Sequence, residues 1–156
     1  MQPKSMRRHL MICGISGALI ATPAQAGEGS RDQMRAGLDA LSHEMSTCAA
    51  YFSLLSAIIE SADGADARVE TARRIKSTGQ AMLVQSINVA NRIGMADDAV
   101  MERMQAALKQ MVDTINGDPP NSLAAMYGQY GRPCDELLAT APRRLAELIA
   151  RDGQDF

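Results

Sequence analysis

Long apolar runs are absent from this sequence after residue 26, because charged residues interrupt each later one. A membrane-spanning helix needs about 20 consecutive apolar residues, so none is expected in that part of the chain. The alternation of apolar and polar residues that is typical of strands is missing too, and no segment of about 20 to 50 residues repeats. These absences favour a fold built from helices alone.

Motifs of several catalytic and cofactor-binding classes are also missing. Neither the Cys-x-x-Cys-His motif of covalent haem attachment nor a glycine-rich phosphate loop occurs. The Gly-x-Ser-x-Gly turn that presents a nucleophilic serine is not found after residue 26. His43 is the only histidine after residue 26, and Thr47 stands where a zinc-binding helix motif needs a second histidine. We therefore predict no catalytic residues and no cofactor, and hence a protein that is not an enzyme.

Residues 1–26 have the organisation of a cleavable signal peptide. A basic segment comes first, an apolar run follows, and small residues at the cleavage position complete the pattern. An N-terminal membrane anchor is the alternative, but the apolar run is too short to cross a bilayer. The sequence predicts cleavage after Ala26 and a periplasmic or secreted protein made of residues 27–156. The three parts are the basic residues Lys4, Arg7 and Arg8, the apolar run 10–21 and the tripeptide 24–26.

The charge balance argues against one broad class of partner. Removal of residues 1–26 takes away three basic residues and no acidic one, which leaves 13 Lys and Arg against 18 Asp and Glu. The resulting net charge is −5. Nucleic-acid-binding domains normally carry a basic patch for the phosphates, so no nucleic-acid partner is expected.

Apolar residues recur at steps of three and four along the rest of the chain, which is the spacing of amphipathic helices. Turn-forming residues separate the periodic segments, most clearly at Asp118-Pro119-Pro120-Asn121. We expect the first helix to begin at 30–32 and to end at 61–64. The sequence predicts the other three segments at 66–94, 97–116 and 123–148.

The fourth segment contains two interruptions, at Gly131-Arg132-Pro133 and at Pro142. Proline is unfavourable in the interior of a helix, so we expect a kinked and segmented fourth helix. Short connections favour antiparallel neighbours. The predicted fold is therefore an all-α, up-down-up-down four-helix bundle. It forms a single helical domain over 27–156, with a frayed tail at 152–156.

Two cysteines, Cys48 and Cys134, remain after residue 26, because Cys13 belongs to the predicted signal peptide. Exported proteins meet an oxidising compartment in which thiols pair. Cys48 lies in the apolar seam of the first helix, and an antiparallel fourth helix would bring Cys134 beside it. A disulfide between them is predicted. It would close a loop of 86 residues, which corresponds to about 4–5 kcal/mol in the loop-entropy model.

The irregular stretch around Gly131 is the predicted binding surface, with Tyr127, Tyr130 and Arg132 as its candidate residues. Irregular backbone leaves polar groups available to a ligand. The tyrosine hydroxyls also have a structural explanation, which is that they hydrogen-bond across the kink and stabilise it. The leading functional hypothesis is a non-enzymatic periplasmic or secreted module that binds another envelope or secreted protein, or the envelope itself.

Two alternatives accompany this hypothesis. The first is a Cu(I)-binding or metal-buffering protein, because methionine is abundant and thioethers are soft ligands; Met101, Met104 and His43 are its candidate ligands. Core packing is the competing explanation for those methionines. The second alternative is a small-ligand site within the bundle at Gly79 and Ser86, where small residues on a buried face leave room or permit close helix approach.

Overall fold

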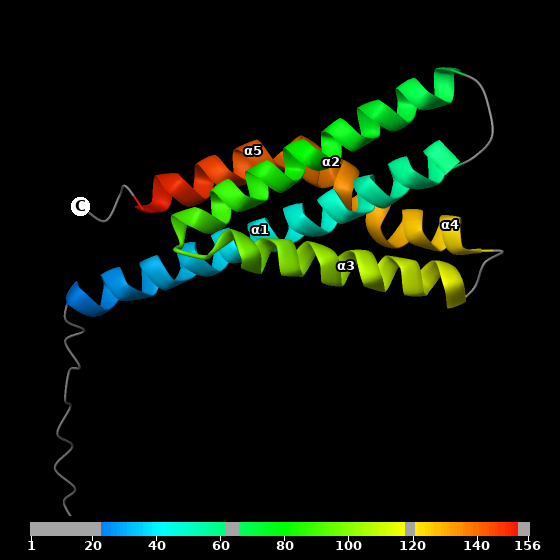
Figure 1. The fold of residues 1–156 in the computed structure, drawn as a ribbon. Helices are drawn as coiled ribbons and strands as arrows, with labels where there is room; N and C mark the ends of the chain where they lie inside the picture. The colour runs from blue at the N-terminus through cyan, green and yellow to red at the C-terminus, as the bar shows by residue number, and fades with distance from the viewer. Residues whose placement is uncertain (1–22, 62–65, 118–120, 153–156) are drawn as a thin grey trace, which may run out of the picture.

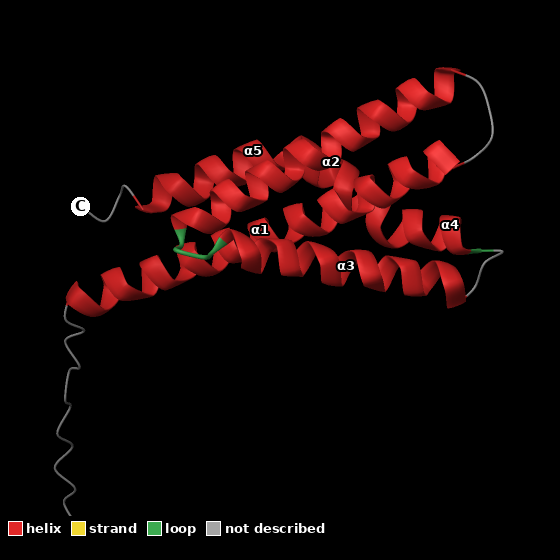
Figure 2. Cartoon of the chain, viewed as in Figure 1, coloured by secondary structure: helices red, strands yellow, loops and turns green. Residues whose placement is uncertain are grey.

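The computed structural model describes residues 23–61, 66–117 and 121–152, and all of its regular elements are helices (Figures 1 and 2). The predicted all-α class is confirmed. Most of the predicted signal peptide, residues 1–22, and the predicted frayed tail beyond residue 152 lie outside the described residues. The elements in chain order are α1 (Pro23–Ser61), α2 (Asp66–Arg92), α3 (Asp97–Gly117), α4 (Ser122–Met126), the π-helix η1 (Tyr127–Gly131) and α5 (Arg132–Asp152).

The predicted helix ends are reproduced to within two residues, except at the start of α1 and at the end of the last segment, which continues to Asp152. The helix begins at Pro23, before the predicted start at 30–32. Proline is favourable at the first position of a helix, because its fixed φ suits the helix and its missing N–H has no partner there. The end of α2 follows the prediction, since Gly94 takes a positive φ of 75°. The Met95 N–H then bonds to the Ala90 carbonyl at 3.1 Å, which closes the helix.

Helix α1 is the element on which the others pack. Close backbone contacts join it to α2, α3 and α5, and Figure 1 shows α2 and α3 on either side of it. In contrast, α2 and α5 make no close backbone contact with each other in the described part of the chain. As a result α1 is buried on several faces. Its buried residues include apolar ones such as Leu41 and polar ones such as Ser46.

The pairs of residues in contact give the directions of the helices. Ser42 bonds to Ser86, while Gly79 lies against Phe52, so α2 is antiparallel to α1. Helix α5 is also antiparallel to α1, because Cys134 joins Cys48 near one end and Arg144 binds Glu44 further along. The disulfide Cys48–Cys134 has a Cα–Cα distance of 5.4 Å. It fixes the start of α5 to the middle of α1.

The last segment is helical from Ser122 to Asp152, although three elements of two kinds compose it, a π-helix between two α-helices. A π-helix replaces the predicted interruption at Gly131-Arg132-Pro133, and α5 continues through Pro142, which the sequence predicted as a second interruption. Pro142 costs the helix one backbone hydrogen bond, the one that its N–H would donate to the Leu138 carbonyl. The flanking turns and the contact with α1 hold the helix together on both sides of it. No helix among the described residues is long and apolar enough to span a membrane.

Candidate functional site

The π-helix η1 positions the residues that the sequence predicts as a binding surface. Its widened turn is defined by a backbone bond from the Arg132 N–H to the Tyr127 carbonyl, five residues apart. The turn lies directly before Pro133, whose ring in a regular α-helix would meet the carbonyl of Gln129. One extra residue in the turn moves that carbonyl aside. Single π-turns inside helices occur frequently at functional sites.

Tyr127 is half exposed, and the missing side chain of Gly131 makes room for its ring. A Cβ atom at Gly131 would overlap the Tyr127 ring and would lie 2.7 Å from the hydroxyl of Tyr51. The ring therefore rests against the backbone of the next turn on one side while its other side faces solvent. Leu123, one turn before Tyr127, is also exposed, at 55%. The two side chains form an apolar pair at the surface.

The other two predicted surface residues divide between surface and core. Arg132 is exposed. Tyr130 is only 7% exposed and belongs to the core, and its hydroxyl accepts a hydrogen bond from the Gln129 side-chain amide at 3.1 Å. We use the name "Tyr127 surface" for Leu123, Tyr127 and Arg132, which are exposed side chains of this region.

A hollow of about 360 Å³ lies on the other side of η1, beside the disulfide. His43 and Thr47 line it from α1, and Tyr130 and both cysteines line it as well. Most polar groups here already have partners: Thr47 donates to the His43 carbonyl at 3.0 Å, and the Tyr130 hydroxyl is engaged by Gln129. The hollow thus combines one exposed histidine with bonded groups, which is not an arrangement for nucleophilic catalysis.

Two groups at the contact of α1 with the last segment have perturbed ionisation. Burial raises the pKa of the Tyr51 phenol, and the nearby Asp135 carboxylate raises it further. The hydrogen bond that the Arg144 guanidinium donates to the Glu44 carboxylate is the main cause of the raised pKa of Arg144. The two Arg144–Glu44 distances are 2.5 and 3.0 Å, so two guanidinium nitrogens bind the carboxylate. Both groups keep their usual charge state at neutral pH, and the Arg144–Glu44 pair joins α5 to α1.

The candidate ligands of the metal-binding alternative lie on different helices. Met101 and Met104 are partly buried on α3, and Met104 packs against the core. His43 lies on α1 and lines the hollow beside the disulfide, which neither methionine lines. Within the described ranges, no group of three or more His, Cys, Asp or Glu side chains is placed to hold a metal ion.

The small residues Gly79 and Ser86 contact α1 directly. A Cβ at Gly79 would lie 3.1 Å from the Phe52 Cβ and 3.2 Å from the Ala49 carbonyl oxygen. Ser86 is fully buried and bonds to Ser42. The space beside both residues is filled by α1, so their small size serves the close approach of two helices.

A groove that the sequence did not predict runs between α2 and α5, which we name the α2–α5 groove. It consists of two hollows of about 290 and 280 Å³ that share Gln85, Ala141 and Pro142. The signal for it was a second apolar stripe on α5 at steps of four and three, beside the stripe that faces α1. The members of this second stripe are Leu138, Pro142, Leu145 and Ile149.

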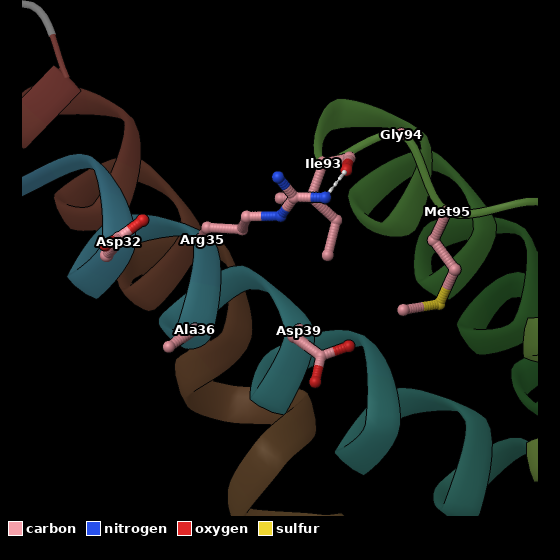
Figure 3. Close-up of a pocket in the computed structure, with 7 residues that line it drawn as sticks. All are labelled: Asp32, Arg35, Ala36, Asp39, Ile93, Gly94 and Met95. Carbon is pink, nitrogen blue, oxygen red and sulfur yellow. Dashed lines mark hydrogen bonds between the residues drawn. The ribbon is translucent and has the colours of Figure 1, made fainter. Parts of the chain in front are cut away.

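A further hollow of about 460 Å³ lies at the turn between α2 and α3 (Figure 3). Arg35 reaches across it from α1 and donates to the Ile93 carbonyl at 3.1 Å, as Figure 3 shows. Asp39 points toward the same region and pairs with Arg103 of α3 at 2.9 Å. These two charged groups of α1 therefore hold the turn and α3 in place, which is a structural role.

No known protein family, curated protein or solved structure matches this chain.

Proposed function

We propose that this protein is an exported, non-enzymatic helical binding protein whose partner is another envelope or secreted protein, and that it binds this partner through the Tyr127 surface. The observation that carries the proposal is the half-exposed Tyr127 ring, held against Gly131 by a π-turn and flanked by exposed Leu123. Tyrosine and arginine are enriched among the residues that dominate protein interfaces.

The pre-ordered position of the ring supports this proposal. A side chain that is already held in its bound position loses little conformational entropy when a partner docks. The ring of Tyr127 lies directly against the backbone of Gly131. The apolar Leu123 extends the contact area by one helical turn, and Arg132 adds a cation that an acidic partner group would satisfy.

The proposal includes export and an up-down-up-down order of the four main helices. Export is supported by the basic, apolar and small-residue pattern of residues 1–26. The helix order is supported by the antiparallel contacts of α1 with α2 and α5. N-terminal sequencing of the protein from the periplasm or medium tests export: Gly27 is the expected first residue, and an uncleaved chain in the cytoplasm would contradict it.

Site-specific photo-crosslinking tests the binding surface. A photoreactive residue at Leu123 is expected to give discrete crosslinked products in cells, and Tyr127→Ala is expected to remove them. The matched control is the same photoreactive residue at Val84, an exposed apolar position on α2. Products that are identical from Val84, or that persist in the Tyr127→Ala protein, would contradict a role for the Tyr127 surface.

A further inference from the structure

We infer that the α2–α5 groove binds a single-chain anionic amphiphile of the fatty-acid class, with its acyl chain between the two helices and its anionic group at Arg92. This site is separate from the Tyr127 surface and does not depend on the function proposed for it. The inference depends on the continuity, the apolar surface, the charge pattern and the length of the groove.

The groove is continuous because its two hollows share three residues, one on α2 and two on α5. It exists because α2 and α5 each pack on α1 without close backbone contact between them. Its hollows of about 290 and 280 Å³ each approach the lower end of the range of small-molecule pockets, which begins at about 300 Å³.

The groove has an apolar floor and one apolar wall that is partly exposed. Met45, Met82 and Val89 line the floor and are almost completely buried. On the α5 wall Leu138 is 41% exposed, although it lies in an apolar stripe at helical spacing. Apolar surface in water is unfavourable by roughly 25 cal/mol for each Å². A bound acyl chain would cover this surface.

The charge pattern of the groove selects an anionic ligand. The chain has 18 acidic residues against 16 basic ones, yet no Asp or Glu lines either hollow. The polar groups of the α2 wall are hydroxyls, amides and one cation, Arg92, which lines one hollow. Arg92 makes no ion pair with any described residue, in contrast to Arg103 and Arg144. An anion at Arg92 therefore meets a cation without competition from a carboxylate of the protein.

The length of the groove fits one extended chain. Ser77 and Arg92 line its two ends and are 15 residues apart, which corresponds to about 22 Å along a helix, the length of an extended acyl chain of about 16 carbons. A partner helix is about 10 Å across and would cover the side-chain amides of Gln85 and Asn88, which line the groove. A thin acyl chain covers less of this polar surface.

Titration of the disulfide-bonded protein with defined amphiphiles tests the inference. Dodecanoate, neutral dodecyl maltoside and cationic dodecyltrimethylammonium are compared below their critical micelle concentrations. Dodecanoate is expected to bind at least tenfold more tightly than the cation. Affinity for fatty acids of 8 to 16 carbons is expected to rise by up to about fourfold for each methylene, because chains up to this length fit within the groove.

Two variants that change the charge of the groove separate a ligand contact from a structural role. Arg92 lies at the C-terminal end of α2, where a cation also offsets the helix dipole. If Arg92 contacts the anion, Arg92→Gln weakens dodecanoate binding about tenfold and leaves dodecyl maltoside binding unchanged. Gln85→Glu places a carboxylate where the two hollows meet and is also expected to weaken the binding of dodecanoate. The matched control is Gln80→Glu, an exposed α2 residue that lines neither hollow.

Three results would overturn the inference. The first is equal binding of the anionic and cationic amphiphiles, or no binding of any. The second is a loss of dodecanoate affinity in Gln80→Glu as large as in Gln85→Glu. The third is a dimer in analytical ultracentrifugation that Leu138→Asp dissociates, since the groove would then be occupied by a second copy of the chain. Melting curves of every variant show that a lost affinity is not a lost fold.

Discussion

Ser42 and Ser86 exchange hydrogen bonds across the interface of α1 and α2. The Ser86 hydroxyl donates to the Ser42 carbonyl at 2.7 Å, and the Ser42 hydroxyl donates to the Ser86 carbonyl at 3.1 Å. Both residues are completely buried. A buried hydroxyl without a partner is costly, so the reciprocal bonds allow two polar residues inside the core and let the helices approach closely.

The serine pair gives the first prediction. Ser86→Ala is expected to lower the free energy of unfolding by about 1 kcal/mol, because one buried hydrogen bond is lost. Ser86→Leu is expected to lower it by about 1–3 kcal/mol more, since the site has no space for added methylenes. Urea denaturation measures both. Ser77→Ala, at an exposed position of the same helix, is the control and should change stability by less than about 0.5 kcal/mol.

The two glycines of η1 give the second prediction. Gly131→Ala is expected to destabilise the protein by about 1–3 kcal/mol, because a methyl there overlaps the Tyr127 ring and approaches the Tyr51 hydroxyl. Gly128 has no atom near its missing Cβ, so Gly128→Ala is expected to stabilise by up to about 1 kcal/mol through helix propensity. Thermal melting of the two variants checks this. Equal effects of both would mean that Gly131 does not hold Tyr127 in place.

The disulfide gives the third prediction. Cys48–Cys134 closes a loop of 86 residues, so the double variant Cys48→Ser and Cys134→Ser is expected to lose about 4–5 kcal/mol of stability in the loop-entropy model. Reduction of the wild-type protein should lower the melting temperature to that of the double variant. An unchanged melting temperature under reductant, together with thiols that react before reduction, would refute the pairing.

Local periodicity was sufficient to predict the helices and to place Cys48 on a face that meets Cys134. Seams of apolar residues at steps of three and four require only neighbouring positions in the sequence. The same seams did not reveal that α1 is buried on several faces, because Ser42 and Ser46 are polar. The hydroxyl of Ser46 bonds within its own helix, whereas that of Ser42 has a partner on α2 that only the fold supplies.

The features that depend on distant residues were predicted less well. The sequence indicated an irregularity at Gly131. It did not indicate that a side chain at this position would collide with the hydroxyl of Tyr51, which lies on another helix. It placed Tyr130 on the same surface as Tyr127, yet a π-turn directs Tyr130 into the core. The α2–α5 groove went unpredicted, because it results from the absence of contact between two helices. The sequence does contain the second apolar stripe with Leu138 and Ile149. However, the stripe indicates a groove only when the neighbours of α5 are known.

The ion pair between Glu44 and Arg144 gives the fourth prediction. Its side chains remain 43% and 37% exposed, so solvent screens the interaction despite the two-nitrogen geometry. A double-mutant cycle of Glu44→Gln and Arg144→Gln is expected to give a coupling of about 0.5–1 kcal/mol. The coupling should fall when salt is raised. A coupling near zero in low salt would show that the disulfide and the apolar contacts alone hold α5 on α1.

Tyr51 gives the last prediction, a loss of stability at alkaline pH. Burial and Asp135 raise the pKa of its phenol in the folded protein, so the neutral form is favoured by folding. The stabilisation is complete below the unfolded pKa of about 10 and decreases as the pH rises through the folded pKa. Above pH 10 the wild type is expected to lose up to about 1.4 kcal/mol per pH unit relative to Tyr51→Phe. Tyr127 and Tyr130 are present in both proteins, so the comparison reports the ionisation of Tyr51, including its repulsion by ionised Tyr127. Urea midpoints at a series of pH values from 8 to about 11 measure the difference. Parallel curves for the two proteins would show that burial of the Tyr51 hydroxyl does not cause the loss of stability at alkaline pH.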